Sequence, residues 1–317
     1  MAGELSAGFE LDAFLRLNQA SWPEWLAALR LLAGLREGQT RPGRAPVGAV
    51  SAVSCAAGTV LCLNACRRMR LGPWRRSGPL WVRVLSGPVR VVGDGEVFQA
   101  GAEDGRLVMV RSGPVVVELG PGSRALLVVP APGIGPAGAP PAPTTARGLV
   151  DDYLFRAGFF LDHADAVRGT RELIDRLTGA LAADAAIRPG PCLDRRLRRA
   201  IDLIQEQRGW VFDLPELARH AGASERNLYY LMKRETGMTP YRFYQRCRLI
   251  RVRRRLVDCR CELPHISWYA ADEGFSHLGR FAALYRQHFG ELPSETVQWR
   301  RRLLQVAGSR AEAVVLP

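Results

Sequence analysis

The side chains with the clearest chemistry lie in a predicted helix that follows Ser224. Leu228, Leu231 and Met232 form an apolar stripe on this helix, which must face a core. The residues left for its outer surface are Arg226, Asn227, Tyr229, Tyr230 and Lys233. A guanidinium can bind O6 and N7 of guanine together, tyrosines can contact thymine methyl groups or phosphate, and a lysine suits phosphate. These residues indicate contact with a nucleic acid duplex.

This helix belongs to one half of a repeat. Residues 214–240 read LPELARHAGASERNLYYLMKRETGMTP, and residues 266–293 read ISWYAADEGFSHLGRFAALYRQHFGELP. The two copies match at an offset of 52, which becomes 53 after one inserted residue. Each copy predicts a short helix, a glycine turn (Gly222 or Gly274), a serine cap (Ser224 or Ser276) and a second helix that ends at Gly-x-x-Pro. This is the helix-turn-helix plan, whose second helix can enter the DNA major groove.

Two such motifs in tandem resemble the AraC/XylS family of bacterial transcription regulators. The second copy carries the most specific residues, which are Gly274, Phe275, Ser276, Phe281, Tyr285, Phe289, Gly290 and Pro293. The resemblance covers about residues 193–302, and the run HLGRFAALYRQHFGELPSET is most similar to the XylS-like branch, whose members often activate catabolic operons. It implies a sequence-specific regulator, more often an activator, that binds direct repeats at promoters, works with RNA polymerase and forms a homodimer.

The family pattern also implies which positions read bases. In the first copy they are Arg226, Tyr229 and Tyr230, and the matching positions in the second are Gly279, Ala282 and Ala283. The second set has no side-chain hydrogen-bonding groups, and the nearby polar residues are His277, Arg280 and Arg286. Arginines there favour the phosphate backbone. We therefore expect the first helix to supply most sequence discrimination, and the second to add affinity and methyl or shape contacts.

Two further helices are predicted around the motifs. Residues 193–207 would bury Leu197, Ile201 and Ile204, and residues 241–258 would bury Leu249, Val252 and Leu256. The rest of the second helix carries Arg246, Arg248, Arg251, Arg253, Arg254 and Arg255, some of which are expected to pair internally with acids such as Asp258 or Glu262. The resemblance implies that this linker helix sets the two reading helices about one DNA turn (~34 Å) apart, for entry into successive major grooves.

Composition agrees with a nucleic-acid partner. The 317 residues suffice for two domains and carry a net charge of +13, with 23 Lys and Arg against 14 Asp and Glu in residues 191–317.

No ordering typical of a Ser-His-Asp triad, paired carboxylates or a Gly-rich phosphate loop rises above chance, so neither enzyme activity nor a cofactor is expected. Seven cysteines indicate reduced thiols. The sequence has no evident signal peptide and no run of ~18 apolar residues. We therefore expect a soluble bacterial protein of the cytoplasm that does not contact a membrane. When it is bound to DNA, we expect it at the nucleoid.

Residues 49–130 change to short β-rich runs with Gly and Pro between them. Eight strands are predicted, at 49–53, 59–63, 80–85, 88–92, 96–98, 107–110, 115–119 and 125–129. Their spacing indicates a sandwich or small barrel, and the resemblance implies a cupin-like jelly-roll sensor domain. The expected fold class is thus α+β, with this barrel joined to an all-α C-terminal domain that carries the two helix-turn-helix motifs and their linker helix.

A barrel without a metal is free to hold a small organic effector. No histidine precedes His163, which disfavours a cupin metal centre, and Cys55, Cys62 and Cys66 are interpreted as buried structural thiols. Candidates to line an effector site are Trp74, Trp81, Phe98 and Met109, and each could equally be plain core.

The remaining boundaries follow from composition. The N-terminal sensor domain is predicted at 1–147, with a helical segment at 9–38 (Ser21 capping a helix with Pro23 in its first turn) and a Pro/Gly-rich loop at 131–146. A helical region at 148–190, broken near Gly169, carries the stripe Leu173, Leu177 and Leu181, which could make a dimer contact or pack on its own barrel. The DNA-binding domain is predicted at 191–305, with motifs at about 214–236 and 265–289, and a flexible tail at 306–317.

Two alternatives stay open. A regulator of this family can respond to a protein partner instead of a small molecule, as virulence regulators do. Alkylation-repair proteins fuse a methyl-accepting cysteine to an AraC-like domain, and Pro191-Cys192 superficially resembles their Pro-Cys-His-Arg acceptor. Here Leu193-Asp194 follows, and four zinc cysteines cannot be assembled, which makes this second alternative a poor match.

Overall fold

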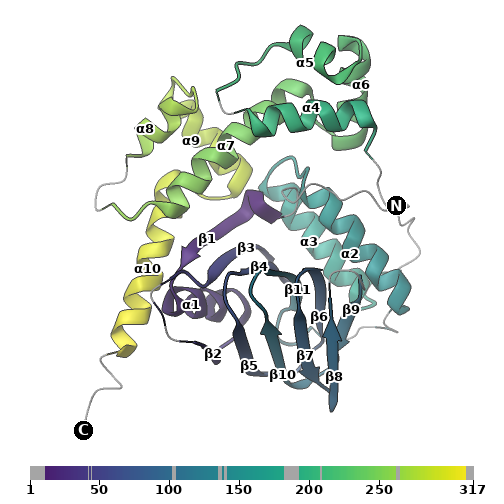
Figure 1. Ribbon diagram of the computed structural model, residues 1–317, viewed down its shortest axis with the longest axis vertical. Coiled ribbons are helices and arrows are strands. Elements are labelled where there is room, and N and C mark those ends of the chain that lie inside the picture. The colour runs from purple at the N-terminus through teal and green to yellow at the C-terminus, as the bar shows by residue number, and fades with distance from the viewer. Residues whose placement is uncertain are drawn as a thin grey trace.

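The computed structural model describes residues 11–41, 43, 45–101, 105–134, 138, 141–181, 193–207, 209–261 and 265–311. Figure 1 shows a β-sandwich at one end, a helical half at the other, and α2 and α3 alongside the sandwich between them. The predicted α+β fold class is confirmed. The predicted domain boundary at 190–191 lies outside the described residues, as do residues 9–10 of the predicted helical segment.

Two antiparallel sheets form the sandwich. The six-stranded sheet has the order β1 (Leu15–Ala20), β3 (Gly48–Cys55), β4 (Gly58–Ala65), β11 (Ser123–Pro130), β6 (Leu80–Ser86) and β9 (Leu107–Val110). The five-stranded sheet has the order β2 (Gly38–Thr40), β5 (Met69–Arg76), β10 (Gly113–Leu119), β7 (Val89–Gly93) and β8 (Glu96–Ala100). The order of the strands is that of a jelly roll, which consists of two interlocked Greek keys: β4-β11-β6-β9 in one sheet faces β5-β10-β7-β8 in the other.

The eight predicted strands are all present, and three more were missed. Strand β5 contains Gly72-Pro73, which reads locally as a turn, yet it pairs with β10 around a register shift between Val115 and Val117. The helical prediction for 9–38 is wrong at 15–20, because β1 pairs with β3 there. Only the short helix η1 (Leu11–Phe14) and α1 (Trp22–Ala33) are helical, and α1 begins at the predicted cap Ser21. Tertiary pairing overrode the local pattern in both places.

The predicted effector-lining residues divide between two cores. Trp74 is buried between the two sheets with Leu80 and Val82, and Phe98 packs against the same cluster. Trp81 and Met109 belong instead to the core between the six-stranded sheet and the helices. Because side chains alternate along a strand, Trp81 must point away from the face that Leu80 and Val82 share. Trp81 and Met109 are therefore not lining residues of the sandwich interior.

Helices α2 (Pro143–Ala157) and α3 (His163–Leu177) cover the outer face of the six-stranded sheet. Leu173 and Leu177 are buried in this core. Of their two predicted roles, they therefore have the packing against their own barrel and not the dimer contact. Leu181 lies beyond the end of α3 and is 48% exposed. The break between the helices is at 158–162, and Gly169 lies inside α3, where a Cβ would come within 2.8 Å of the Phe160 ring. The predicted loop at 131–146 ends early because Pro143 starts α2.

The cysteines of the sandwich also differ from the prediction. Cys62 is buried, Cys55 is half-buried, and Cys66 is exposed. Among the residues that the structure describes, no group of three or more His, Cys, Asp or Glu side chains could hold a metal ion. Cys192 of the alkylation-repair alternative lies outside those residues.

The helical half contains two helix-turn-helix units joined by a long helix. Its elements are α4 (Arg195–Glu206), α5 (Leu214–Ala221), α6 (Glu225–Thr236), α7 (Pro240–Asp258), α8 (Ile266–Asp272), α9 (Leu278–Phe289) and α10 (Pro293–Ala311). Helix α10 corrects the predicted tail at 306–311, while 312–317 lie outside the described residues. Trp299 and Leu303 of α10 pack against the sandwich core, where α10 also contacts α1. No helix among the described residues is both long and apolar enough to cross a lipid bilayer.

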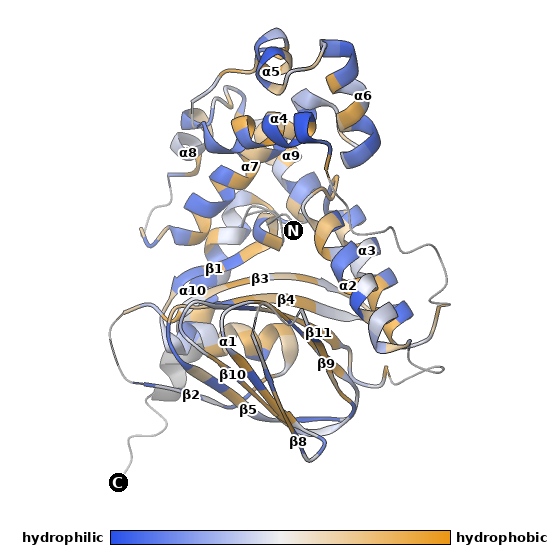
Figure 2. Ribbon diagram, turned by 45° about the vertical axis from the view of Figure 1, so that its right-hand side comes forward, coloured by the Kyte–Doolittle hydropathy of each residue, from blue (hydrophilic) through white to orange (hydrophobic). Residues whose placement is uncertain are grey.

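Hydropathy follows this packing. Figure 2 shows the hydrophobic residues concentrated on the sandwich strands, and hydrophilic turns on α6 at the far end of the molecule. The sandwich, the helices that cover it and the first helix-turn-helix unit each have their own buried apolar cluster. Phe155 of α2 and Phe159, just after that helix, belong to the cluster of the first helix-turn-helix unit. The covering helices thus also support the DNA-binding half.

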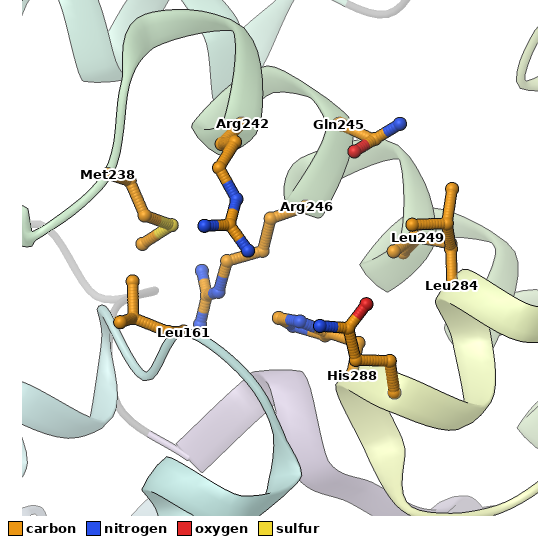
Figure 3. A pocket seen from close by; sticks show the side chains of 9 residues that line it. Leu161, Met238, Arg242, Gln245, Arg246, Leu249, Leu284 and His288 are labelled. Carbon is orange, nitrogen blue, oxygen red and sulfur yellow. The ribbon is translucent and has the colours of Figure 1, made fainter.

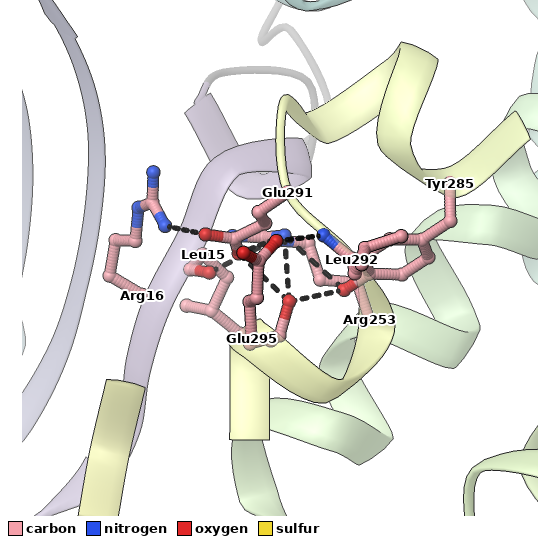
Figure 4. Close-up of polar contacts among 8 residues, drawn as sticks. Leu15, Arg16, Arg253, Tyr285, Glu291, Leu292 and Glu295 are labelled. Carbon is pink, nitrogen blue, oxygen red and sulfur yellow. Dashed lines mark hydrogen bonds and ion pairs between the residues drawn. The ribbon is translucent and has the colours of Figure 1, made fainter. Parts of the chain in front are cut away.

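A buried arginine of α7 connects the two halves (Figure 4). Arg253 is 1% exposed and donates through Nε to the Leu15 carbonyl of β1 at 3.1 Å. Its Nη1 lies 2.9 Å from Glu291 and contacts the Tyr285 hydroxyl at 3.3 Å. Arg16 of β1 binds the other oxygen of Glu291 at 2.6 Å. One carboxylate therefore holds cations from the sandwich and from the linker helix.

A second buried arginine, in α10, also connects the helical half to the sandwich. Arg300 of α10 donates to Glu24 of α1 at 2.8 Å, to the Val257 carbonyl at 3.0 Å and to the Asn18 carbonyl at 3.2 Å. The Ser21 backbone N–H also donates to Glu24 at 2.7 Å. This site joins α10 and the end of α7 to β1 and α1.

The predicted internal pairing of α7 arginines with acids is confirmed, but the acids differ from the two given as examples. Arg251 binds Glu273 at 2.6 Å, Arg254 binds Asp12 at 3.2 Å and Arg255 binds Asp272 at 2.8 Å. Asp258 instead accepts from the Asn18 side chain, and Glu262 lies outside the described residues. The partners come from distant segments, which local spacing could not indicate.

Replacing Arg253 tests this junction. Arg253→Met should lower the free energy of unfolding by about 3–5 kcal/mol, because it removes the cation paired with a buried carboxylate. Urea denaturation checks the value. Arg254→Met, which removes an exposed pair, should cost less than about 1 kcal/mol. Equal losses in the two variants would contradict the assignment.

The pKa of Glu291 generates a second expectation. Burial by itself would raise this pKa, but the charges of Arg253 and Arg16 and the hydrogen bond from Thr296 lower it to about 2. Because the pKa of Glu291 is lower in the folded protein than in the unfolded chain, its charged form stabilises the fold at pH values above the unfolded pKa of about 4.5. This stabilisation is lost as the pH falls from about 4.5 toward 2.

The contribution of Glu291 should be about 3 kcal/mol by the linkage of 1.36 kcal/mol per pKa unit. Urea unfolding between pH 2.5 and 7 should therefore show a shallower acid dependence for Glu291→Gln than for the wild type. The exposed Glu37→Gln is the control and should keep the wild-type slope. An unchanged slope in Glu291→Gln would overturn the expectation.

Candidate nucleic-acid interface

The two helix-turn-helix units share the backbone hydrogen bonds of their turns. In the turns, the Ala223 N–H donates to the Ala218 carbonyl at 3.0 Å, and the Phe275 N–H donates to the Ala270 carbonyl at 2.9 Å. The turn glycines 222 and 274 have φ of 72° and 74°, a left-handed conformation that favours glycine. The predicted turns are confirmed at both positions.

The starts of the two outer helices differ. Ser224 caps α6 by accepting from the Asn227 N–H at 3.3 Å, as predicted. Helix α9 has His277 at its cap position without a side-chain cap bond, so the predicted role of Ser276 is wrong. The reason is the inserted residue, because an offset of 53 places His277, not Ser276, at the position of Ser224.

Each outer helix is held by its own core. Leu228 and Met232 of α6 are fully buried with α4, α5 and α7. Phe281 and Tyr285 of α9 are buried with α7 and α8. The inward stripe predicted for α6 is confirmed, and α9 has a corresponding buried face; these buried faces orient the opposite faces outward.

The outward face of α6 presents the predicted residues together. Tyr229 and Tyr230 are 46% and 63% exposed, and Arg226 and Lys233 are exposed on either side. Their spacing of i, i+3, i+4 and i+7 places all four on one helical face. Asn227 is half-buried. The Lys233 ammonium donates to the Gly237 carbonyl at 3.2 Å, which places it at the end of the helix.

The outward face of α9 is flatter. Its exposed residues are His277, Gly279, Arg280, Ala283 and Arg286, and Ala282 is half-buried. A Cβ added at Gly279 would meet no heavy atom within 4 Å, so packing does not require a glycine there. This surface allows close approach and offers cations only near its edges.

Two exposed apolar residues of the second unit were missed. Leu278 is 49% exposed at the first residue of α9, and Trp268 is 58% exposed on α8. The repeat itself contains the signal, because these positions match Glu225 and Glu216 in the first unit. A position that is polar in one copy and apolar in the other indicates that the two units meet different surroundings.

Comparison with known proteins agrees with the geometry. The family described as "Helix-turn-helix domain" matches residues 217–299. The XylDLEGF operon transcriptional activator 2 of Pseudomonas putida is 33% identical over 136 residues, which are 43% of this chain and 83% of that protein. The chain belongs to the AraC/XylS family.

Two other AraC/XylS relatives illustrate the extent of the likeness. The XylDLEGF operon transcriptional activator 1 of Pseudomonas putida is 29% identical over 160 residues, 48% of each chain, so this chain spans about half the length of that relative. A solved structure of a probable AraC family transcriptional regulator from Rhodopseudomonas palustris has 31% identity and a TM-score of 0.31, covering 33% of this chain and 96% of that one.

The different helix starts within this AraC/XylS chain can be tested. Ser224→Ala should lower the free energy of unfolding by about 1 kcal/mol, because it removes the side-chain acceptor at the start of α6. Ser276→Ala is the matched control and should change it by less than about 0.5 kcal/mol. Urea denaturation measures both. A larger loss in Ser276→Ala than in Ser224→Ala would contradict the assigned caps.

Proposed function

We propose that this protein is a sequence-specific DNA-binding transcription regulator that acts as an activator. The observation that carries the proposal is the exposed face of α6, where Arg226, Tyr229 and Tyr230 project from a helix whose other face completes a core. Large exposed tyrosines need a contact surface, and the edge of a base pair with its adjacent phosphates supplies one.

The two reading helices have different roles in this proposal. Helix α6 discriminates between sequences, with Arg226 suited to guanine and the tyrosines to thymine methyl groups or phosphate. Helix α9 adds affinity through Arg280, Arg286 and His277, while Gly279, Ala282 and Ala283 make close methyl or shape contacts. Lys233 contributes to phosphate binding.

Helix α7 supports binding to two successive major grooves. Its 19 residues span roughly 28 Å at 1.5 Å per residue, which is comparable to the ~34 Å between successive major grooves. The packing of α7 against both units limits how far their reading helices can move apart. Promoter direct repeats, a homodimer and contact with RNA polymerase complete the proposal, by analogy with the family.

The N-terminal half is proposed to regulate DNA binding through its rigid junction with α7 and α10. Two kinds of signal are candidates, a small organic effector and a protein partner. Mostly aliphatic side chains, together with Trp74, are buried between the two sheets, and this apolar lining favours a protein partner over an effector inside the sandwich. A dimer would need a surface other than Leu173 and Leu177, which are buried in their own chain.

A genome-wide footprint of the bound protein tests the function. Wild type should protect discrete direct-repeat sites, and Arg226→Ala/Tyr229→Ala should lose them, because base contacts are worth about 1–3 kcal/mol each. Arg75→Ala, which removes the same charge from exposed β5, is the control and should keep the wild-type footprint.

Base substitutions within a protected site then separate the two helices. Changes under α6 should weaken binding by more than those under α9. Equal costs would reject the assigned division of roles. Diffuse protection that is the same in the wild type and the double variant would reject sequence-specific reading altogether.

A further inference from the structure

A small cavity lies where α7, α9 and the connection between α2 and α3 meet (Figure 3). Its volume is about 40 Å³. Arg242, Gln245 and Arg246 line it from α7, Gln287 and His288 line it from α9, and Leu161 closes it from the connection. Water needs roughly 10–15 Å³ of such space, so this volume admits a few atoms of a polar ligand.

One of the buried polar groups that line this space is Arg246. It is only 5% exposed, and its Nε has no hydrogen-bond partner. Within the described part of the chain, its guanidinium forms no ion pair with any carboxylate. Arg253 and Arg300, the other buried arginines, each bind a glutamate. Arg246 therefore lacks the anionic partner that buried arginines have elsewhere in this protein.

The opposite wall adds a second polar atom without a partner. His288 is 5% exposed, and its Nε2 makes no hydrogen bond, while its ring bonds to the Leu161 backbone. Figure 3 shows Arg242 and Arg246 descending from α7 toward the same space, with His288 beside it. Two guanidinium groups thus converge where no acidic side chain lines the cavity.

Burial determines the charge state of these groups. It lowers the pKa of Arg246 to about 10, so the guanidinium remains a cation at neutral pH. It also lowers the pKa of His288 to about 3, with the nearby Arg246 contributing, so this imidazole is neutral. A buried cation without a counter-charge is costly, and an anion at this position would remove most of that cost.

We propose that this cavity binds a small oxyanion, a phosphate or carboxylate group, with Arg246 as its principal ligand. Arg242 supplies a second cation at the opening, and Gln245 and Gln287 supply amide donors. A planar guanidinium binds two oxygens of such a group at once, which suits Arg246 at the base of the cavity. The bound anion joins the linker helix, the second reading helix and the α2–α3 connection, so its presence affects how firmly α9 is held.

Thermal unfolding with inorganic phosphate tests the site. At constant ionic strength and pH 7, replacing chloride by 50 mM phosphate should raise the wild-type Tm by about 3 °C, as expected for a ligand present above its Kd. Arg246→Met should abolish this rise. In chloride, Arg246→Met should be at least as stable as the wild type, because it replaces a buried unpaired cation by an apolar side chain of similar length.

Two further variants make the result decisive. Arg242→Met, an exposed position that should fold, is expected to weaken the response to phosphate several-fold without abolishing it. Arg75→Met, exposed on β5 and far from the cavity lining, should respond like the wild type. Phosphate should also shift the His288 imidazole resonances, assigned with His288→Gln, in the wild type but not in Arg246→Met.

The proposal is overturned if Arg246→Met keeps the wild-type rise in Tm, or if phosphate leaves the His288 resonances unchanged in the wild type. The source of the anion is read separately, from the salt dependence of DNA binding. A slope smaller by about one in Arg246→Met identifies a DNA phosphate as an occupant, and an unchanged slope identifies a free oxyanion. This comparison distinguishes the two sources after the changes in Tm and in the His288 resonances have shown binding, and it does not depend on which DNA sequence is recognised.

Discussion

The structure depends on the buried contact of Arg253 with Glu291 and the Leu15 carbonyl. Arg253 comes from the linker helix, Glu291 from the turn between α9 and α10, and Leu15 from the first strand of the sandwich. Because both charges are largely out of water, separating α7 from the turn between α9 and α10 would leave Arg253 without its carboxylate, and moving β1 away would remove the Leu15 carbonyl from Arg253. The linker helix is therefore fixed to the second helix-turn-helix unit and to the edge of the sheet by the same group of atoms.

Among the described residues, three buried arginines show two ways of placing a cation in the interior. Arg253 and Arg300 are neutralised by Glu291 and Glu24, and both also donate to main-chain carbonyls of β1. Arg246 has neither kind of partner among the described residues and faces a cavity instead. The first two explain the rigid attachment of the helical half to the sandwich. The third identifies a position where the protein's own residues leave the charge balance incomplete.

Much of the helical half could be predicted from the sequence, because its signals are local. The turn glycines at 222 and 274 and the stripe of Leu228 and Met232 depend on residues within four or five positions of each other. The same local rules failed at Ser276, where one inserted residue moved the cap to His277. They failed more widely at 15–20, because the strand there is stabilised by β3 and by α7, both distant in sequence.

By itself, the sequence determined the two helix-turn-helix units, the family and the residues that face outward on α6 and α9. These follow from helical periodicity, capping and a repeat that specifies each position twice. Only the tertiary structure decided that Trp81 faces the covering helices, that Leu173 and Leu177 are buried in their own chain, and which acids the α7 arginines bind. Those outcomes depend on which segments meet in space, and contacts between residues of separate helices and strands leave no pattern in a local stretch of sequence.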